Sequence, residues 1–319
     1  MFNRYLKCKS LLIIITLLLL TGTLKAQQYP IYSQYIFNGL VLNPAYAGSH
    51  VQLSASAMYR NQWVNFEGAP KTLFFSAHTS LMNEKMGLGL LINDDRIGSY
   101  SNQNIYGSYA FIIKTPKGKL AMGVSAGLNI LSADYGNLNL DDIADNSFAS
   151  VTGNLRPNFG TGVYFYNKTL FAGFSVPFLL NNGFGDVNLE NTLNEIRSAR
   201  YYYLNGGLML PLNLEKTVHI QPSVLIRGQE GAPLNFDINT SFIFYDLLNV
   251  GVSYRNIDAV VSYIDFKLSE SFHFSYSYDW TTSAIRTASH GTHEFMLNYR
   301  VRLRDIHDDV KCPKFNYFM

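Results

Sequence analysis

Hydrophobic and polar residues alternate along most of this chain, in segments of about ten residues separated by turn-forming residues. The clearest segment is SFHFSYSYDW, residues 271–280, in which every second residue is aromatic and the residues between are serine, histidine or aspartate. A period of two places alternate side chains on opposite faces of a β-strand. The pattern therefore predicts an all-β protein.

The alternation predicts about fourteen strands, an even number as bacterial single-chain barrels have. The expected strands lie near residues 51–63, 73–81, 86–92, 105–113, 120–130, 157–167, 169–177, 198–211, 217–228, 234–245, 248–256, 259–267, 270–280 and 290–303.

The connections between these strands alternate in length. After even-numbered strands they are short, with turns starting at Asn83, Pro116, Asn167, Leu212, Tyr245 and Leu268. After odd-numbered strands most are long, namely residues 93–103, 133–156, 177–197 and 281–291, although NIDA at 256–259 is short. Outer-membrane barrels have short periplasmic turns and longer extracellular loops. This arrangement places both termini on the periplasmic side.

Composition narrows the class of protein. Charged residues make up 15% of the chain, and it contains 22 Phe and 22 Tyr. Beyond residue 26 no window approaches the roughly twenty apolar residues of a spanning helix. In lipid every backbone polar group must be paired internally, and without helices only a closed barrel achieves this. We therefore predict a transmembrane antiparallel β-barrel. The alternative is a soluble β-sandwich, but strands of ten residues exceed the usual five or six.

The N-terminus indicates export. Three basic residues precede an apolar run at 11–20, and small residues follow up to Ala26, which is typical of a secretory signal peptide. Its removal takes four of the 25 basic residues and none of the 23 acidic ones, leaving 21 against 23 and a charge of −2. This balance argues against a nucleic-acid partner. Only Cys312 remains, so an intramolecular disulfide is excluded.

The chain thus divides into four parts. We expect a signal peptide at 1–26, a periplasmic or plug segment at 27–50, the barrel at 51–303 and a periplasmic tail at 304–319.

Three motifs invite a catalytic or metal-binding interpretation, but none has the structural context or spacing that the chemistry requires. The GVSAG stretch at 123–127 matches a nucleophile elbow but lies within a strand. His293 and Glu294 are adjacent on a strand, so they point to opposite faces and cannot share a ligand shell. The aspartates of LDDIADN, residues 140–146, lack the EF-hand spacing. We predict a non-enzymatic protein with no cofactor and no metal.

A further cluster lies at the start of the first long loop, where Asp94, Asp95 and Arg96 are consecutive. An arginine flanked by two carboxylates is able to pin a loop, and we interpret this cluster as structural, with an interaction role open.

Two stretches carry a family resemblance. PIYSQYIFNGLVLNPAYAGS, residues 30–49, followed by YRNQWVNFEGAPKTLFFSAHTSL, residues 59–81, resembles the PorP/SprF family of the type IX secretion and gliding-motility systems of Bacteroidetes. NDDRIG at 93–98, THEFMLNYRV at 292–301 and KCPKF at 311–315 agree with it. The residues that map onto the family pattern, and so form the candidate partner and plug site, are Asn43, Pro44, Ala45, Tyr46, Gly48, Tyr59, Arg60, Gln62, Trp63, Asp94, Arg96 and Gly98.

The resemblance implies a non-enzymatic barrel in the outer membrane, in contact with its lipid, that serves as a binding platform. One branch of such families tethers periplasmic secretion-system or peptidoglycan-linked proteins. The other pairs with a large secreted or cell-surface adhesin and supports its secretion or surface attachment. The alternative function is a channel for small hydrophobic molecules similar to fatty-acid transporters, which also carry an Asn-Pro-Ala stretch in a plug.

The LVLNPAYAGS stretch, residues 40–49, is then the segment before the first strand. Asn43 is biased away from helix because Pro44 follows, and Pro44 lacks a donor, so the chain must turn there. We predict that residues 30–50 form an ordered plug or inner-rim segment in which Ile36, Phe37 and Tyr46 are buried.

Overall fold

The computed structural model describes residues 32–134, 151–180, 200–230, 232–256 and 258–301, together with the backbone of two short strands at 183–184 and 196–197. The predicted signal peptide at 1–26, the predicted tail at 304–319 and the acidic loop motif at 140–146 lie outside the described residues. Within the described ranges, no helix has the length and apolar character needed to cross a membrane.

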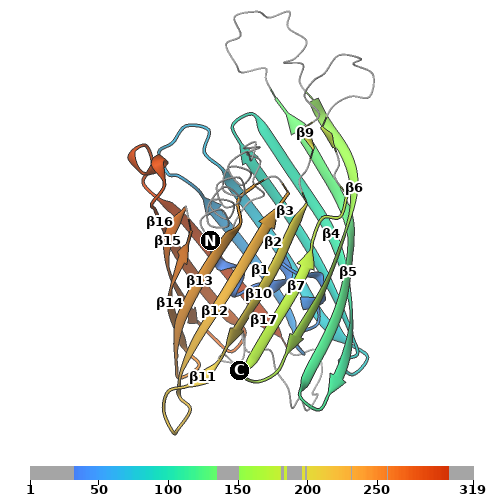
Figure 1. The fold of residues 1–319 in the computed structure, drawn as a ribbon, viewed down its shortest axis with the longest axis vertical. Coiled ribbons are helices and arrows are strands. Elements are labelled where there is room, and N and C mark those ends of the chain that lie inside the picture. The colour runs from blue at the N-terminus through green and yellow to red at the C-terminus, as the bar shows by residue number, and fades with distance from the viewer. Residues whose placement is uncertain are drawn as a thin grey trace, which may run out of the picture.

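The wall of the molecule is a closed antiparallel barrel of fourteen strands (Figure 1). β1 pairs with β17 and closes the sheet, while β11 continues β10 after Met209, so that these two count as one wall strand. A separate hairpin joins β8 (Gly183–Phe184) and β9 (Ile196–Arg197). The wall strands are β1 (Leu53–Asn61), β2 (Lys71–Leu81), β3 (Met86–Ile97), β4 (Tyr100–Thr115), β5 (Gly118–Ala133), β6 (Val151–Tyr166), β7 (Leu170–Val176), β10 (Tyr201–Leu208), β11 (Leu210–Pro211), β12 (Val218–Gln229), β13 (Asn235–Phe244), β14 (Leu248–Arg255), β15 (Ala259–Lys267), β16 (Phe272–Thr281) and β17 (Thr292–Val301).

The barrel is polar inside and apolar outside. In β16, His273, Ser275 and Ser277 are buried, whereas Phe272 and Phe274 are exposed on the outer face. A soluble protein would have the opposite arrangement, because apolar surface is driven out of water. An apolar exterior with a polar interior is the pattern of barrels in lipid. The soluble β-sandwich alternative is therefore wrong, and the predicted barrel of fourteen strands is confirmed.

One predicted loop is instead part of the wall. Residues 93–103 were expected to form a long loop, but β3 continues to Ile97 and β4 begins at Tyr100, leaving a tight turn at 98–99. The polar residues of this stretch still alternate between the two faces, and a strand that is not surrounded by lipid needs no apolar face. The predicted loop is wrong because polar composition alone does not distinguish such a strand from a loop.

Residues 32–50 form the predicted plug. Three short 3-10 helices, η1 (Ser33–Ile36), η2 (Gly39–Val41) and η3 (Pro44–Tyr46), are packed inside the barrel. Ile36, Phe37 and Tyr46 are 3%, 3% and 1% exposed, as predicted. η1 contacts β16 and β17, η2 contacts β2 and β3, and η3 contacts β4, β5 and β6. The plug therefore crosses the lumen from one side of the wall to the other.

The plug also runs along the barrel axis. Ser33 bonds to residues near the long-loop ends of β16 and β17, whereas His50 packs on His78 near the short-turn end of β2. The chain thus descends through the lumen before it enters β1 at Leu53.

Candidate functional site

Asn43 fixes both the turn and the position of the plug. Its side-chain oxygen accepts a hydrogen bond from the Ala45 backbone N–H at 2.9 Å, which caps η3, and Pro44 occupies the first helical position. Its Nδ2 donates to the carbonyl oxygens of Val163 in β6, at 3.0 Å, and Phe174 in β7, at 3.3 Å. The Asn-Pro-Ala core is therefore a capped turn whose amide is bonded to the barrel wall.

The small residues of the motif allow backbone to touch backbone. A Cβ added at Gly123 in β5 would overlap the backbone of Ala45, and one added at Gly87 in β3 would overlap that of Ala47. Gly48 has φ +73°, a left-handed conformation that suits glycine, and its own position leaves no room for a Cβ beside Gly87. The GVSAG stretch thus supplies a seat for the plug.

Tyr46 packs into an aromatic cluster at the base of the plug. Its ring makes edge contacts with His50, His78 and Tyr164 at centroid distances of 5.8, 5.4 and 5.3 Å. Its hydroxyl lies 3.3 Å from His50 Nε2. Such aromatic pairs add about 0.5–1.5 kcal/mol each beyond area burial.

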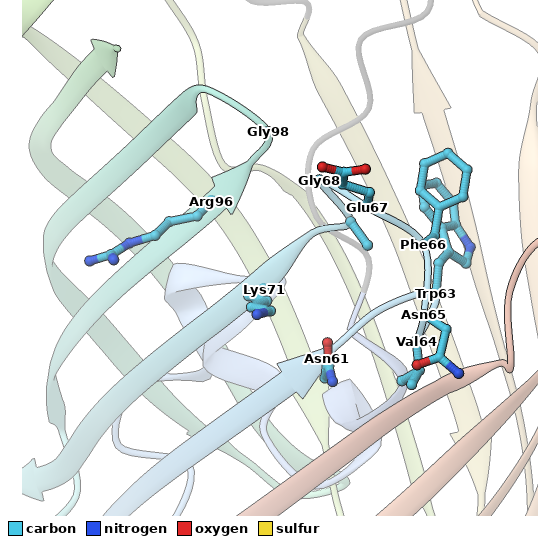
Figure 2. A pocket seen from close by; sticks show the side chains of 11 residues that line it. Asn61, Trp63, Val64, Asn65, Phe66, Glu67, Gly68, Lys71, Arg96 and Gly98 are labelled. Carbon is cyan, nitrogen blue, oxygen red and sulfur yellow. The ribbon is translucent and has the colours of Figure 1, made fainter. Parts of the chain in front are cut away.

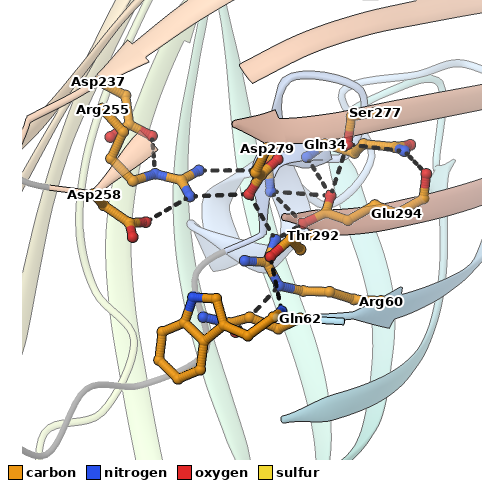
Figure 3. A network of polar contacts seen from close by, with 12 residues as sticks. Gln34, Arg60, Gln62, Asp237, Arg255, Asp258, Ser277, Asp279, Thr292 and Glu294 are labelled. Carbon is orange, nitrogen blue, oxygen red and sulfur yellow. Dashed lines mark hydrogen bonds and ion pairs between the residues drawn. The ribbon is translucent and has the colours of Figure 1, made fainter. Parts of the chain in front are cut away.

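A buried network of charges surrounds η1 near the long-loop end of the lumen (Figure 3). Arg60 of β1 bonds to Glu294 of β17, and its Nη1 is 3.4 Å from Asp279 Oδ2 of β16. Three arginines and four carboxylates take part, contributed by β1, β12, β13, β14, the turn after β14, β16 and β17. The members are Arg60, Arg227, Arg255, Asp237, Asp258, Asp279 and Glu294.

Arg255 is the hub of this network. It contacts Asp237, Asp258 and Asp279 at 3.3, 3.2 and 3.4 Å. Arg227 adds a second cation on Asp237, at 2.6 Å. Buried charges are tolerated only when they are paired and hydrogen-bonded, and here each described carboxylate of the network contacts at least one guanidinium.

The plug supplies hydrogen-bond donors to the charge network. The backbone N–H groups of Ser33 and Gln34 donate to Glu294 at 2.8 and 3.0 Å. The Ser33 hydroxyl lies 2.8 Å from both oxygens of Asp279 and accepts a hydrogen bond from Arg255 Nη2 at 3.0 Å. With four carboxylates and three arginines, the network has one excess negative charge, and these donors of η1 solvate it.

A second candidate region lies at the long-loop end, where residues 62–70 connect β1 and β2. Val64 exchanges backbone hydrogen bonds of 2.9 Å with His290 and Gly291 in the loop before β17, and Gly98 donates to Gly68 O at 2.9 Å. These bonds join the β1–β2 loop (62–70), the β3–β4 turn (98–99) and the loop before β17 (282–291) into one surface, which we call the loop platform.

The loop platform contains a pocket of about 450 Å³. Figure 2 shows Trp63 and Phe66 grouped at one side of it and Lys71 and Arg96 at the other. Phe66 is 43% exposed, and its ring meets that of Trp63 edge-on at 6.5 Å. The lining residues are Asn61, Trp63, Val64, Asn65, Phe66, Glu67, Gly68, Ala69, Lys71, Arg96 and Gly98.

Two residues of this loop hold an unfavourable backbone conformation. Trp63 has φ +47° and Asn65 has φ +69°. A left-handed conformation is rare for a bulky aromatic residue, and such strain persists only where the surroundings fix it, often at functional sites. Here the loop-to-loop hydrogen bonds of Val64 lie between the two strained residues.

The remaining predicted residues lie in different places and do not form one site. Tyr59 faces outward from β1 and is 42% exposed, so it belongs to the membrane-facing surface. Gln62 Oε1 lies 3.4 Å from Arg60 Nε at the edge of the charge network. Arg96 pairs with Asp94 at 2.8 Å on the outer face, but Asp95 points into the lumen and bonds to Thr72. The expectation that Arg96 lies between two carboxylates is therefore wrong, because neighbours on a strand face opposite sides.

Sequence reasoning missed most of the charge network. It discussed Glu294 only as a metal ligand and did not single out Asp237, Arg255 or Asp279. The available signal was a charged residue at a lumen-facing position of an otherwise alternating strand. Among the described residues, no group of three or more His, Cys, Asp or Glu side chains is arranged to hold a metal ion.

A comparison with protein families identifies the family to which the chain belongs. The model of the family described as type IX secretion system membrane protein PorP/SprF matches residues 24–299. The chain belongs to this family. No curated protein sequence matches it.

Solved structures with a similar course of the chain are other membrane barrels. The Acinetobacter baumannii outer membrane protein Omp33 is 8% identical, with 79% of this chain and 99% of that one covered at a TM-score of 0.46. The CymD monoaromatic hydrocarbon channel is 12% identical, with 88% and 95% covered at a TM-score of 0.49. The KdgM porin is 8% identical, with 77% and 98% covered at a TM-score of 0.36.

Acidification is expected to loosen the plug. Burial lowers the pKa of His50 well below its ordinary value of 6.5, and His78, Arg300 and His273 lower it further. The folded plug therefore keeps this imidazole neutral beside Tyr46, so stability is lost as pH falls below about 6.5. Hydrogen exchange of residues 32–50 between pH 7.5 and 5 is expected to show falling protection, with a smaller fall in H50Q. An identical profile for H50Q would contradict the assignment to His50.

Proposed function

We propose that this PorP/SprF family protein is a non-enzymatic binding platform of the type IX secretion system in the outer membrane. Its long-loop end faces the cell surface and its short turns face the periplasm, in line with the usual arrangement of such barrels. The observation that carries the proposal is the plug. Residues 32–50 are bonded to the wall on several sides, so a protein client is served at the ends of the barrel and does not pass through it.

The loop platform is the proposed contact for a large secreted or cell-surface protein. It combines an exposed Phe66 and a half-buried Trp63 with a hydrogen-bonded backbone, and protein interfaces are enriched in Trp, Phe and Tyr. The strained conformations of Trp63 and Asn65 support a functional role for this loop. The short-turn end is the proposed contact for a periplasmic secretion-system or peptidoglycan-linked partner.

The alternative, a channel for small hydrophobic molecules, requires the plug to move. A solute would pass only if residues 32–50 moved, and movement would break the Asn43 bonds, the Gly87 and Gly123 contacts and the charge network together. A plug fixed by a disulfide distinguishes the two functions.

In the variant N38C/S76C, the plug is expected to be locked without loss of function. Asn38 Nδ2 donates to Ser76 Oγ at 2.6 Å, so these side chains already meet across the plug and β2. In a C312S background, cells carrying the oxidised variant should display type IX clients as the wild type does, and S76C alone is the control. If surface display fails on oxidation and returns on reduction, the plug moves during function and the closed platform is wrong.

Removal of the aromatic pair is expected to abolish client contact. W63A/F66A should lower the yield of secreted protein crosslinked to the barrel on intact cells by at least about tenfold, on the scale of about 2 kcal/mol or more for an interface hot spot. Y245A is the matched control, since Tyr245 is an exposed aromatic residue on a short turn at the other end. Equal losses in both variants, or none in W63A/F66A, would count against the loop platform.

A further inference from the structure

Four exposed lysines gather on three neighbouring short turns. Lys85 lies in the turn between β2 and β3, Lys114 and Lys117 lie at the β4–β5 turn, and Lys168 lies between β6 and β7. Lys114 is 54% exposed, and the other three are also classed as exposed. We call these four residues the basic rim.

The one carboxylate in these three turns, that of Glu84, is already paired with two lysines. Glu84 is 2% exposed, and the Nζ atoms of Lys114 and Lys119 each lie 2.9 Å from its Oε2. Burial raises the pKa of Glu84, but hydrogen bonds from Lys114 and Lys119 outweigh it and hold the pKa below the ordinary value. Five lysines against one glutamate leave four positive charges. Glu84 organises the rim and does not neutralise it.

The basic rim is held in a fixed geometry. Asn167 Nδ2 donates to Lys117 O at 3.0 Å and thereby links the β6–β7 turn to the β4–β5 turn. Glu84 links the β2–β3 turn to β4 and β5 through its two lysines. Met82, Asn83 and Glu84 have φ of +52°, +54° and +62°, three successive left-handed residues whose conformation these contacts stabilise.

The opposite arc of the same end has a different character. Its turns carry exposed apolar side chains together with mixed charges, among them Leu212, Leu214, Glu215, Lys216, Tyr245, Asp246, Leu268 and Glu270. Figure 1 shows the turn between β11 and β12 projecting from this end. Net positive charge is therefore concentrated in the sector between β2 and β7.

We propose that the basic rim is a docking surface for an acidic face of a periplasmic protein. This inference rests on the proposed function, which requires a periplasmic partner but does not say where it binds. Complementary charge speeds encounter and fixes orientation. A protein is favoured over anionic lipid because Lys117 and Lys168 lie in turns beyond the strand ends, and because a fluid lipid surface requires no fixed arrangement of charges.

The test is charge reversal combined with crosslinking. The variant K85E/K117E/K168E leaves Lys114 and Lys119 on Glu84, and a photoreactive p-benzoylphenylalanine at Thr169 reports contacts on intact cells. We expect a periplasmic protein to be crosslinked through a segment rich in Asp and Glu, with the yield at least tenfold lower in the reversed variant. The single reversal K216E on the opposite arc should leave the yield unchanged.

Two controls keep the proposal falsifiable. If charge reversal impairs folding, judged by heat-modifiable electrophoretic migration, K85Q/K117Q/K168Q removes the charge without reversing it. Nanodiscs of phosphatidylcholine, with or without phosphatidylglycerol, test for lipid binding. Crosslinks that persist after reversal, crosslinks to a segment that is not acidic, or a rim that responds only to phosphatidylglycerol would overturn the proposal. Loss of client contact at the loop platform is measured separately, so a failure of this inference is distinguished from a failure of the proposed function.

Discussion

Replacing Gly123 with valine is expected to displace the plug from its seat. The added side chain would overlap the backbone of Ala45, and a shift of β5 or η3 would break the pairing of β5 with β4 or the bonds of Asn43 to β6 and β7. We expect the free energy that stabilises the docked plug to fall by about 3 kcal/mol or more, at or beyond the upper end of the usual cost of overpacking a core. The measurements are protease sensitivity of residues 32–50 and conductance in planar bilayers, both of which should rise.

Gly107→Ala is the matched control for this prediction. Gly107 lies on neighbouring β4, but a Cβ there has Ala126 O as its nearest atom, at 3.9 Å. This variant should behave as the wild type. If G123V remains closed and protease-resistant, the tight contact between plug and wall is not essential to the seat.

Replacing Arg60 with methionine is expected to destabilise the folded barrel strongly. Glu294 and Asp279 would lose a buried cation while remaining out of water, and breaking a buried ion pair in this way costs about 3–5 kcal/mol. Urea-induced unfolding in lipid vesicles measures the loss. The double variant R60M/E294Q should recover part of it, because the amide leaves no uncompensated charge at that position.

Arg96→Met provides the comparison on the outer face. Arg96 is 67% exposed and pairs with Asp94 alone, so its loss should cost no more than about 1 kcal/mol. Similar losses for R60M and R96M would show that the lumen network contributes no special stability.

The barrel and its plug were predictable from sequence because both leave local signals. The alternation in residues 271–280 repeats along most of the wall, and the Asn43–Pro44 pair favours a turn. The extent of β3 and β4 was not predictable in the same way. Outside lipid the outer face of a strand carries polar residues, and Asp94 and Arg96 then resemble a loop.

The charge network could not be derived from the sequence. Its members come from β1 at one end of the chain and from β12 to β17 at the other, and only the register of β1, β16 and β17 brings Arg60, Asp279 and Glu294 together. The seat of the plug is hidden for the same reason. Gly87 and Gly123 appear in sequence as ordinary glycines of two strands, and their meaning depends on which segment crosses the lumen beside them.

The position of η1 also bears on the order of assembly. Ser33 is bonded to Glu294, 261 residues later in the chain, so the first helix of the described residues docks on the last described strand of the wall. Until β16 and β17 have joined β1, the N-terminal segment has no complete binding site, and an unplugged barrel leaves Glu294 without its backbone donors. Closing the barrel and docking the plug are therefore expected to occur as one cooperative, late step of folding.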